Sequence, residues 1–109
     1  MFNKKTMPAR YTIWKLVSIK KSTKPEKKLM ATFLNLDTGR KKTTHFGAFG
    51  MSDYTKHKDK ERKLRYINRH KQRENWKDPT TAGALSRYIL WNKTSLKSSI
   101  LDFKKKFRL

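Results

Sequence analysis

A tight-turn signal between two β-prone segments constrains the fold of this chain more than any other feature. Asp37-Thr38-Gly39 follows the segment LMATFLNL at 29–36 and precedes KKTTHF at 41–46. A three-residue loop of this kind is a type I turn followed by a glycine in the left-handed conformation, and it joins antiparallel strands. We therefore expect the two segments to pair as a β-hairpin.

A third strand is expected before the hairpin, where residues 11–20 (YTIWKLVSIK) are rich in β-branched and aromatic side chains. Strict alternation would place Tyr11, Ile13, Val17 and Ile19 on one face and Trp14 and Leu16 on the other. This pattern predicts a three-stranded antiparallel meander over residues 11–46, with both faces of its first strand at least partly covered.

The segment Gly47-Ala48-Phe49-Gly50 ends the predicted sheet. Two glycines around a small and an aromatic residue predict an unusual backbone path with Phe49 tucked under the fold. A phosphate-cradling loop is a weaker reading, because no Walker-type Lys-Thr pair follows.

Three helices are predicted after the sheet, over residues 60–73, 82–91 and 95–107. Asp59 can cap the first helix, and Thr80 or Thr81 the second. The third shows apolar residues at helical spacing at Leu96, Ile100, Phe103 and Phe107. We expect an α+β fold, with a basic N-terminal arm at 1–10 and a single small domain at 11–109.

The helix predicted at 60–73 carries a row of arginines. Arg62, Arg65, Arg69 and Arg73 fall on one face at about 100° per residue, and Leu64 and Ile67 lie almost opposite as the expected core side. The row is roughly 16 Å long at about 1.5 Å per residue, enough to follow several phosphates of a nucleic-acid strand. Tyr66 and His70 border the row and could stack on a partner or donate hydrogen bonds to it.

The chain is strongly cationic, with 29 Lys and Arg against 8 Asp and Glu and a formal net charge of +21. The positive charge is spread over both halves, so the folded body itself is expected to be cationic. Further polyanion contacts are predicted at Lys41, Lys42, Lys56, Lys58 and Lys63. The alternative reading of any charged helix face is that it is only solvated; here the choice of arginine, whose planar fork pairs bidentately with phosphate, favours binding.

Several classes of chemistry find no support in the sequence. There is no cysteine, hence no disulfide and no thiolate metal site, and no apolar run approaches the roughly 18 residues of a membrane span. The candidate metal set would be Asp53, His57, Asp59 and His70, but its spacings match no ligand pattern. We expect a non-enzymatic protein with no metal, no cofactor and no small-molecule substrate.

Residues 45–76 and 81–107, together with the hairpin LNLDTGRKKTTHFG, resemble a family of small basic proteins of unassigned function. That family is encoded by large nucleocytoplasmic DNA viruses of algae and amoebae. The resemblance implies a viral protein located in the virion, and in the host cytoplasm, at the virus factory, or in the nucleus during infection.

Two functions remain open at this point. The first is binding to the phosphate backbone of nucleic acid, double-stranded DNA in particular, in genome packaging or organisation. The alternative is a minor capsid or internal cement protein that binds acidic capsid proteins.

Overall fold

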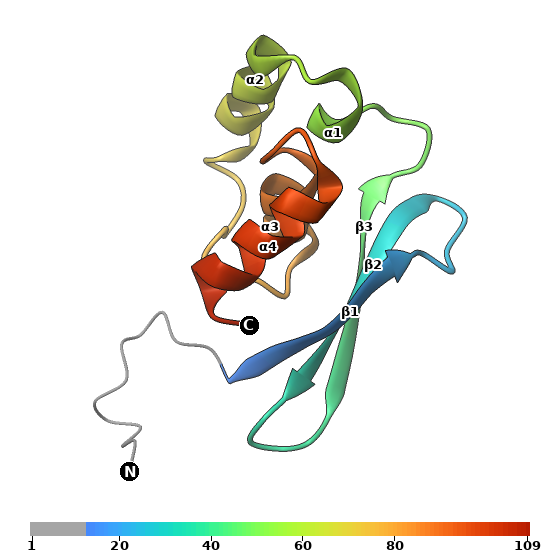
Figure 1. Cartoon of the computed structure of the whole chain (residues 1–109), viewed down its shortest axis with the longest axis vertical. Coiled ribbons are helices and arrows are strands. Elements are labelled where there is room, and N and C mark those ends of the chain that lie inside the picture. Colours follow the sequence, from blue (N-terminus) through green and yellow to red (C-terminus); the bar gives the residue numbers. More distant parts are fainter. Residues whose placement is uncertain (1–12) are drawn as a thin grey trace.

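The computed structural model describes residues 13–109 and has an α+β architecture. The strands β1 (Trp14–Lys21), β2 (Lys27–Asn35) and β3 (Lys41–Ala48) form an antiparallel sheet in the order β1-β2-β3. The helices α1 (Tyr54–His57), α2 (Lys60–His70), α3 (Ala82–Leu85) and α4 (Leu96–Phe107) follow, and α3 continues as the π-helical segment η2 (Ser86–Leu90) (Figure 1). The predicted fold class is confirmed. The basic arm predicted at 1–10 lies outside the described residues.

The β2–β3 hairpin forms at the predicted turn. Gly39 has a φ of 74°, in the left-handed region, and its backbone N–H donates to the Asn35 carbonyl at 2.8 Å. The Asn35 side-chain oxygen accepts from the backbone N–H groups of Asp37 and Thr38 at 2.9 and 3.1 Å. The turn chemistry expected from the sequence is therefore confirmed.

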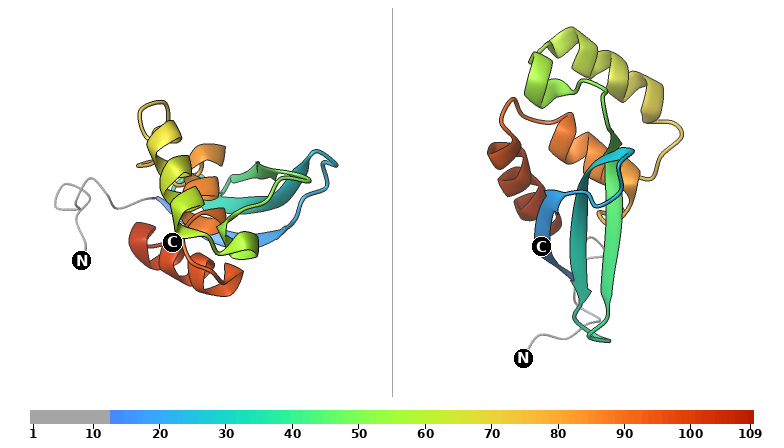
Figure 2. Two further views of the ribbon diagram at one scale, coloured as in Figure 1. Left: turned by 90° about the horizontal axis from the view of Figure 1, so that it is seen from above. Right: turned by 90° about the vertical axis from the view of Figure 1, so that its right-hand side faces the viewer.

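The prediction for the faces of β1 is wrong, because the strand contains a β-bulge. The register with β2 shifts between Leu16 and Ser18, so that Val17 is the extra residue. An extra residue resets the alternation, and Trp14, Leu16 and Ile19 all belong to the face that packs on the core, while Val17 is 48% exposed. Helices cover only this inner face; no element of residues 13–109 lies over the other face, toward the viewer in the right panel of Figure 2.

The core lies between the inner face of the sheet and the segment formed by α3, η2 and α4. Phe33 and Phe46 from the sheet pack with Leu85, Ile89 and Phe103 from the helices, and all five are fully buried. Burying each of these side chains contributes about 1.5–3 kcal/mol of hydrophobic stabilisation. The helices in the second half of the chain thus cover the inner face of the sheet.

The glycine segment at residues 47–50, which spans the end of β3, has the expected unusual backbone, but Phe49 does not tuck under the fold. Gly47 and Gly50 have φ values of 77° and 85°. A Cβ on Gly47 would lie 2.6 Å from Leu90 Cδ1. Leu90 thus lies close under Gly47, and Phe49 is 67% exposed.

The helix boundaries differ from the predicted ones in three places. α2 ends at His70 rather than at residue 73. The chain then turns, and the Glu74 carboxylate contacts the His70 ring and accepts a hydrogen bond from the Trp76 indole. The helix predicted at 82–91 begins at Ala82, capped by Thr81, but finishes as η2. The four-residue α1 was not predicted. α4 is confirmed, with Ser95 as its cap. No helix within residues 13–109 has the length and apolar character needed to cross a bilayer.

Candidate nucleic-acid interface

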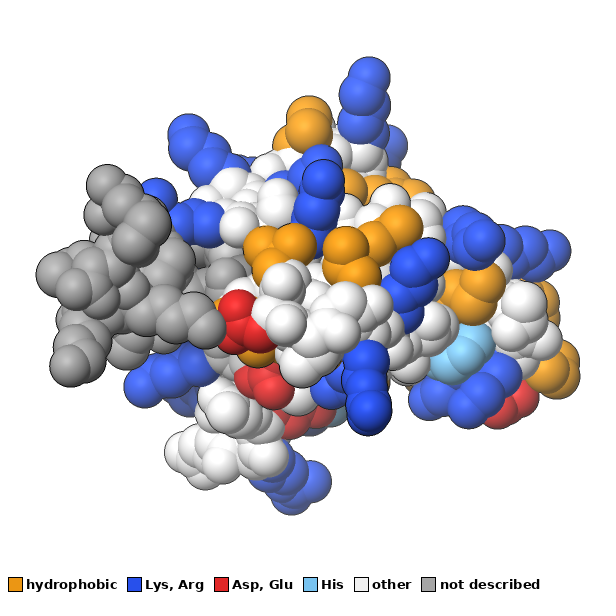
Figure 3. Space-filling view, turned by 90° about the horizontal axis from the view of Figure 1, so that it is seen from below, with side chains coloured by type: hydrophobic (Ala, Val, Ile, Leu, Met, Phe, Trp, Pro, Cys, Tyr) orange, Lys and Arg blue, Asp and Glu red, His pale blue; other side chains and the backbone are white. Residues whose placement is uncertain are grey.

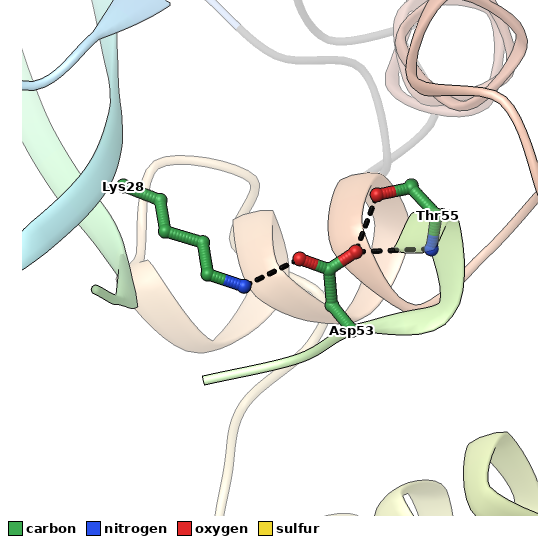
Figure 4. Close-up of polar contacts among 3 residues, drawn as sticks. All are labelled: Lys28, Asp53 and Thr55. Atoms are coloured by element: carbon green, nitrogen blue, oxygen red, sulfur yellow. Dashed lines mark hydrogen bonds and ion pairs between the residues drawn. The ribbon is translucent and has the colours of Figure 1, made fainter. Parts of the chain in front are cut away.

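The approach to α2 is fixed by a buried ion pair. Asp53 is 2% exposed, and its Oδ2 lies 2.5 Å from Lys28 Nζ on β2 (Figure 4). Its Oδ1 accepts from the backbone N–H of Thr55 at 2.9 Å and from the Thr55 hydroxyl, so the Asp53 carboxylate caps α1. Asp53 therefore ties the end of the sheet to the first of the two consecutive helices.

The N-terminus of α2 is capped as the sequence predicts. Asp59 Oδ1 accepts from the backbone N–H groups of Glu61 and Arg62 at 3.0 and 3.4 Å. The Asp59 backbone N–H donates to His57 Nδ1 at 2.9 Å, and Lys58 between the two helices adopts a left-handed conformation with φ of 57°. These interactions set the angle at which α2 leaves α1.

Two side chains on one face of α2, Lys63 and Tyr66, attach it to the segment after η2, and His70 packs on Tyr66 within the helix. The Tyr66 ring stacks on Trp91 with centroids 4.4 Å apart and an interplanar angle of 4°, and the His70 ring stacks on Tyr66 at 4.2 Å. Lys63 Nζ donates to the Asn92 carbonyl at 2.7 Å. Aromatic stacking of this kind stabilises by about 0.5–1.5 kcal/mol beyond the burial of area.

The orientation of α2 consequently differs from the predicted one. Leu64, expected on the core side, is 58% exposed, and Ile67 is only half-buried. At about 100° per residue the attached face lies roughly a quarter turn from the predicted core side. The Tyr66 ring, which is buried against Trp91, takes the place on the attached face that was expected for Leu64 and Ile67.

The predicted arginines keep their exposure on the flank of α2. Arg62, Arg65 and Arg69 are exposed there. Arg65 Nη1 lies 3.9 Å from Glu61 Oε2, with both side chains largely in solvent, and such a surface pair contributes between nothing and about 1 kcal/mol. Arg73 is also exposed but follows the helix in a turn, its backbone N–H donating to the His70 carbonyl at 3.0 Å. The flank therefore has three helical arginines, with Arg73 beyond its end.

The predicted lysines do not form one patch with this flank. Lys56 and Lys58 are exposed on and beside α1, close in the chain to α2. Lys41 and Lys42 lie near the β2–β3 turn, at the opposite end of the long axis from α2 (Figure 1). Lys42 Nζ donates to the Thr80 hydroxyl at 2.9 Å, which ties it to the helical layer.

Lys63 and Tyr66 are committed to interactions inside the protein. Burial, together with the positive charges of Arg87, Lys93 and Lys60, lowers the pKa of Lys63. Burial and the nearby Glu74 carboxylate raise the pKa of Tyr66 to about 12. In the free protein neither side chain projects from the arginine flank toward a partner.

His70 is held from two sides. Its Nδ1 lies 3.4 Å from Glu74 Oε1, and its ring stacks on Tyr66. Glu74 Oε2 accepts from Trp76 Nε1 at 2.8 Å, and a Cβ on Gly83 would lie 2.6 Å from the same oxygen. The contacts of the Glu74 carboxylate with His70, Trp76 and Gly83 were not predicted, because the sequence indicates only that a helix ends near this residue.

A cleft of about 390 Å³ separates α2 from the end of the sheet. Arg69 and His70 line it from α2, Lys27 and Lys28 from β2, and the acids Asp53 and Glu74 also reach it. Because the two acids face the cations inside the same hollow, its charge is mixed. Beside the exposed arginine flank stand two acids among residues 13–109: Glu61, which lies 3.9 Å from Arg65, and Asp59, whose carboxylate caps the start of the helix.

The four candidate metal ligands serve other purposes. Asp53 pairs with Lys28, Asp59 caps α2, His57 accepts from the Asp59 backbone and His70 meets Glu74. Among residues 13–109, no three His, Asp or Glu side chains come together in a way that could hold a metal ion.

Fold and surface together define a small, strongly cationic α+β domain with an arginine-bearing helix mounted at one end of its sheet. Residues 17–70 match the model of a family described as a family of unknown function (DUF5754). This stretch holds the sheet from Val17 onward, α1 and α2, and leaves out α3, η2 and α4. The likeness to a family without assigned function is thus confirmed for the hairpin and residues 45–70, whereas the expected resemblance at 71–76 and 81–107 lies outside the match. No curated protein and no solved structure matches the chain.

Proposed function

We propose that the protein binds the phosphate backbone of nucleic acid through the arginine flank of α2 and serves to package or organise a genome. The resemblance noted in the sequence makes a viral genome the candidate, with the virion and the virus factory as the places of action. Neither catalysis nor a cofactor enters the proposal.

The observation that carries the proposal is that one face of α2 contacts the rest of the protein while a different face presents exposed arginines. The helix is attached through Lys63, which bonds the Asn92 carbonyl, and Tyr66, which stacks on Trp91. This attachment leaves Arg62, Arg65 and Arg69 exposed. Arginine pairs bidentately with phosphate, and each phosphate neutralised releases counterions from the nucleic acid. A net charge of +21 adds long-range attraction to any polyanion.

The test is binding of the whole protein to a random-sequence DNA duplex over a range of salt concentrations. For the wild type we expect log K to fall linearly with log salt, with a slope of about −0.9 per phosphate neutralised. Changing Arg62, Arg65 and Arg69 to Glu should abolish binding near physiological salt while the far-ultraviolet circular dichroism spectrum is retained.

The matched control changes Lys24, Lys77 and Lys97 to Glu. These three side chains are exposed and lie outside α2, and the change in net charge is the same. Because net charge alone would weaken both variants equally, the proposal requires a much larger loss of affinity for the arginine variant. Equal losses would show that the flank is not the site.

One observation favours the alternative, a capsid or cement protein. Phe49 and Met51 are 67% and 64% exposed, and Phe49 borders a hollow of about 340 Å³ that Leu29, Leu90 and Leu96 also line. Exposed apolar side chains beside a hollow are typical of protein-binding surfaces. A cement protein would stay with the shell in fixed stoichiometry after genome release, whereas a packaging protein would leave with the DNA.

A further inference from the structure

The uncovered face of the sheet is the largest surface that the arginine flank does not explain. The register pairs its residues in three rows across β1, β2 and β3: Lys15–Leu34–Lys41, Ser18–Thr32–Thr43 and Lys20–Met30–His45. The opposite alternation contains the buried Leu16, Ala31, Phe33 and Phe46. The rows therefore belong to the face that no helix of residues 13–109 covers (Figure 2, right).

The charge on this face has one sign. None of the three strands contains Asp or Glu. Lys15, Lys20 and Lys41 are exposed and stand on the two edge strands, while the middle strand contributes Met30, Thr32 and Leu34. Seen from the end that carries the β2–β3 turn, Lys and Arg side chains project at several places along the outline, and a smaller number of Asp and Glu side chains lie among them (Figure 3).

Protection of the sheet edges is not by itself enough to explain why the strands contain lysines and no acidic residues. Charged side chains on edge strands prevent two sheets from pairing, and lysine is a common choice. A mixture of acids and bases would protect the edges equally well and would reduce the self-repulsion of a chain with a net charge of +21. An acid-free sheet therefore indicates a negatively charged partner.

The dimensions fit one such partner. β1 and β3 are two strand spacings apart, or roughly 10 Å at about 4.8 Å per spacing. The major groove of B-form DNA is about 12 Å wide and admits β-structure, with phosphates along both margins. Lysines on the edge strands would meet those phosphates while the middle strand faces the base edges.

The middle strand β2, together with Thr43 and His45 of the edge strand β3, carries groups suited to a groove floor. The hydroxyls of Thr32 and Thr43 lie 3.2 Å apart and can donate to or accept from base edges, and the half-buried Met30 and Leu34 can contact thymine methyl groups. His45 Nδ1 lies 2.7 Å from the Ser22 hydroxyl, which fixes the ring at the end of the third row.

We propose that the uncovered face of the sheet enters the major groove of double-stranded DNA, with Lys15, Lys20 and Lys41 on the flanking phosphates. This inference rests on the proposed nucleic-acid binding and adds the form of the ligand and the groove. Duplex RNA is a poorer fit, since its major groove is deep and narrow. A single strand has no groove to occupy.

The test compares duplex DNA, duplex RNA and single-stranded DNA of the same base sequence with the whole protein. We expect the highest affinity for duplex DNA, and weaker binding when guanines are methylated at N7, an atom that lies in the major groove. Changing Lys15, Lys20 and Lys41 to Gln should reduce the steepness of the log K against log salt plot by about 2.7, or roughly 0.9 for each of the three phosphates that is no longer neutralised.

The control variant changes Lys24, Lys77 and Lys97 to Gln, which removes the same charge from exposed positions outside this face. If the sheet variant keeps the wild-type slope, or N7 methylation has no effect, while the arginine variant loses binding, the inference is overturned and the proposed function stands. If the wild type binds no nucleic acid near physiological salt, the proposed function fails first. Equal affinity for all three nucleic acids would also overturn the inference, because a groove-reading face must prefer duplex DNA.

Discussion

Replacing Trp91 by Ala tests whether one aromatic platform holds the arginine helix in place. The Trp91 ring lies parallel to Tyr66 at 4.4 Å and also contacts the His57 ring at 5.3 Å. Core Trp-to-Ala substitutions cost about 3–5 kcal/mol. Because Trp91 is only half-buried, we expect the lower end of that range, about 3 kcal/mol.

A loss of about 3 kcal/mol is large for a small domain, whose total stability is typically about 5–15 kcal/mol. Urea denaturation followed by circular dichroism should show the midpoint falling by roughly 1–3 M at an m-value of about 1–3 kcal/mol/M. Hydrogen exchange should show the greatest loss of protection in α2. Trp91→Phe, which keeps a stacking ring, should lose about half as much stability.

The same substitution connects stability to binding. Trp91→Ala removes no charge, yet we expect it to weaken DNA binding, because a frayed α2 no longer holds Arg62, Arg65 and Arg69 in one row. Unchanged protection of α2 together with a cost below about 0.5 kcal/mol, the scale of an ordinary surface substitution, would refute the account of how the helix is attached.

Three further substitutions test separate parts of the structure. Gly47→Ala should cost about 2–5 kcal/mol in urea denaturation, because Gly47 has a positive φ and the added Cβ would meet Leu90 Cδ1 at 2.6 Å; a cost near zero would contradict that close approach. Lys63→Met should lower the free energy of unfolding by about 0.5–1.5 kcal/mol, because it removes the hydrogen bond to the Asn92 carbonyl. Since Lys63 faces inward, the slope of log K against log salt for DNA binding should not change. A slope shallower by about 0.9 would show that Lys63 neutralises a DNA phosphate instead. The pKa of Tyr66 is raised to about 12, so its contribution to stability is present below pH 10 and is lost as the pH rises toward 12; measured against Tyr66→Phe, the wild type should lose at most about 2.7 kcal/mol over that interval, and parallel pH curves would rule the shift out.

The features predicted correctly from the sequence depend on neighbouring residues. The hairpin turn at Asp37-Thr38-Gly39 and the cap at Asp59 are each decided within four or five residues by a hydrogen bond that the side chain or the glycine permits. The α4 pattern likewise follows from periodicity alone. Local chemistry of this kind can be read without the fold.

The features that were missed depend on residues distant in the chain. α2 takes its orientation from the stack of Tyr66 on Trp91, 25 positions apart, and Asp53 finds Lys28 across 25 positions as well. The bulge at Val17 shows itself only in the register with β2. For the same reason the sequence grouped Lys41 with the arginines, although the sheet carries it to the other end of the molecule.

The residues proposed to bind DNA and the helical residues that cover the sheet come largely from different parts of the chain. Residues 17–70 contain α2 and all of the uncovered sheet face except Lys15, so both proposed DNA-binding surfaces fall almost wholly within the stretch that matches the family. The side chains that cover the inner face of the sheet, Leu85, Ile89 and Phe103 among them, come from outside it. Their truncation should therefore lower stability and leave the salt slope of the folded fraction unchanged, whereas changes on the two cationic surfaces should do the reverse. A domain built this way can carry a large positive charge because its core side chains, Phe33 and Phe46 from the sheet and Leu85, Ile89 and Phe103 from the helices, are distinct from its exposed cations.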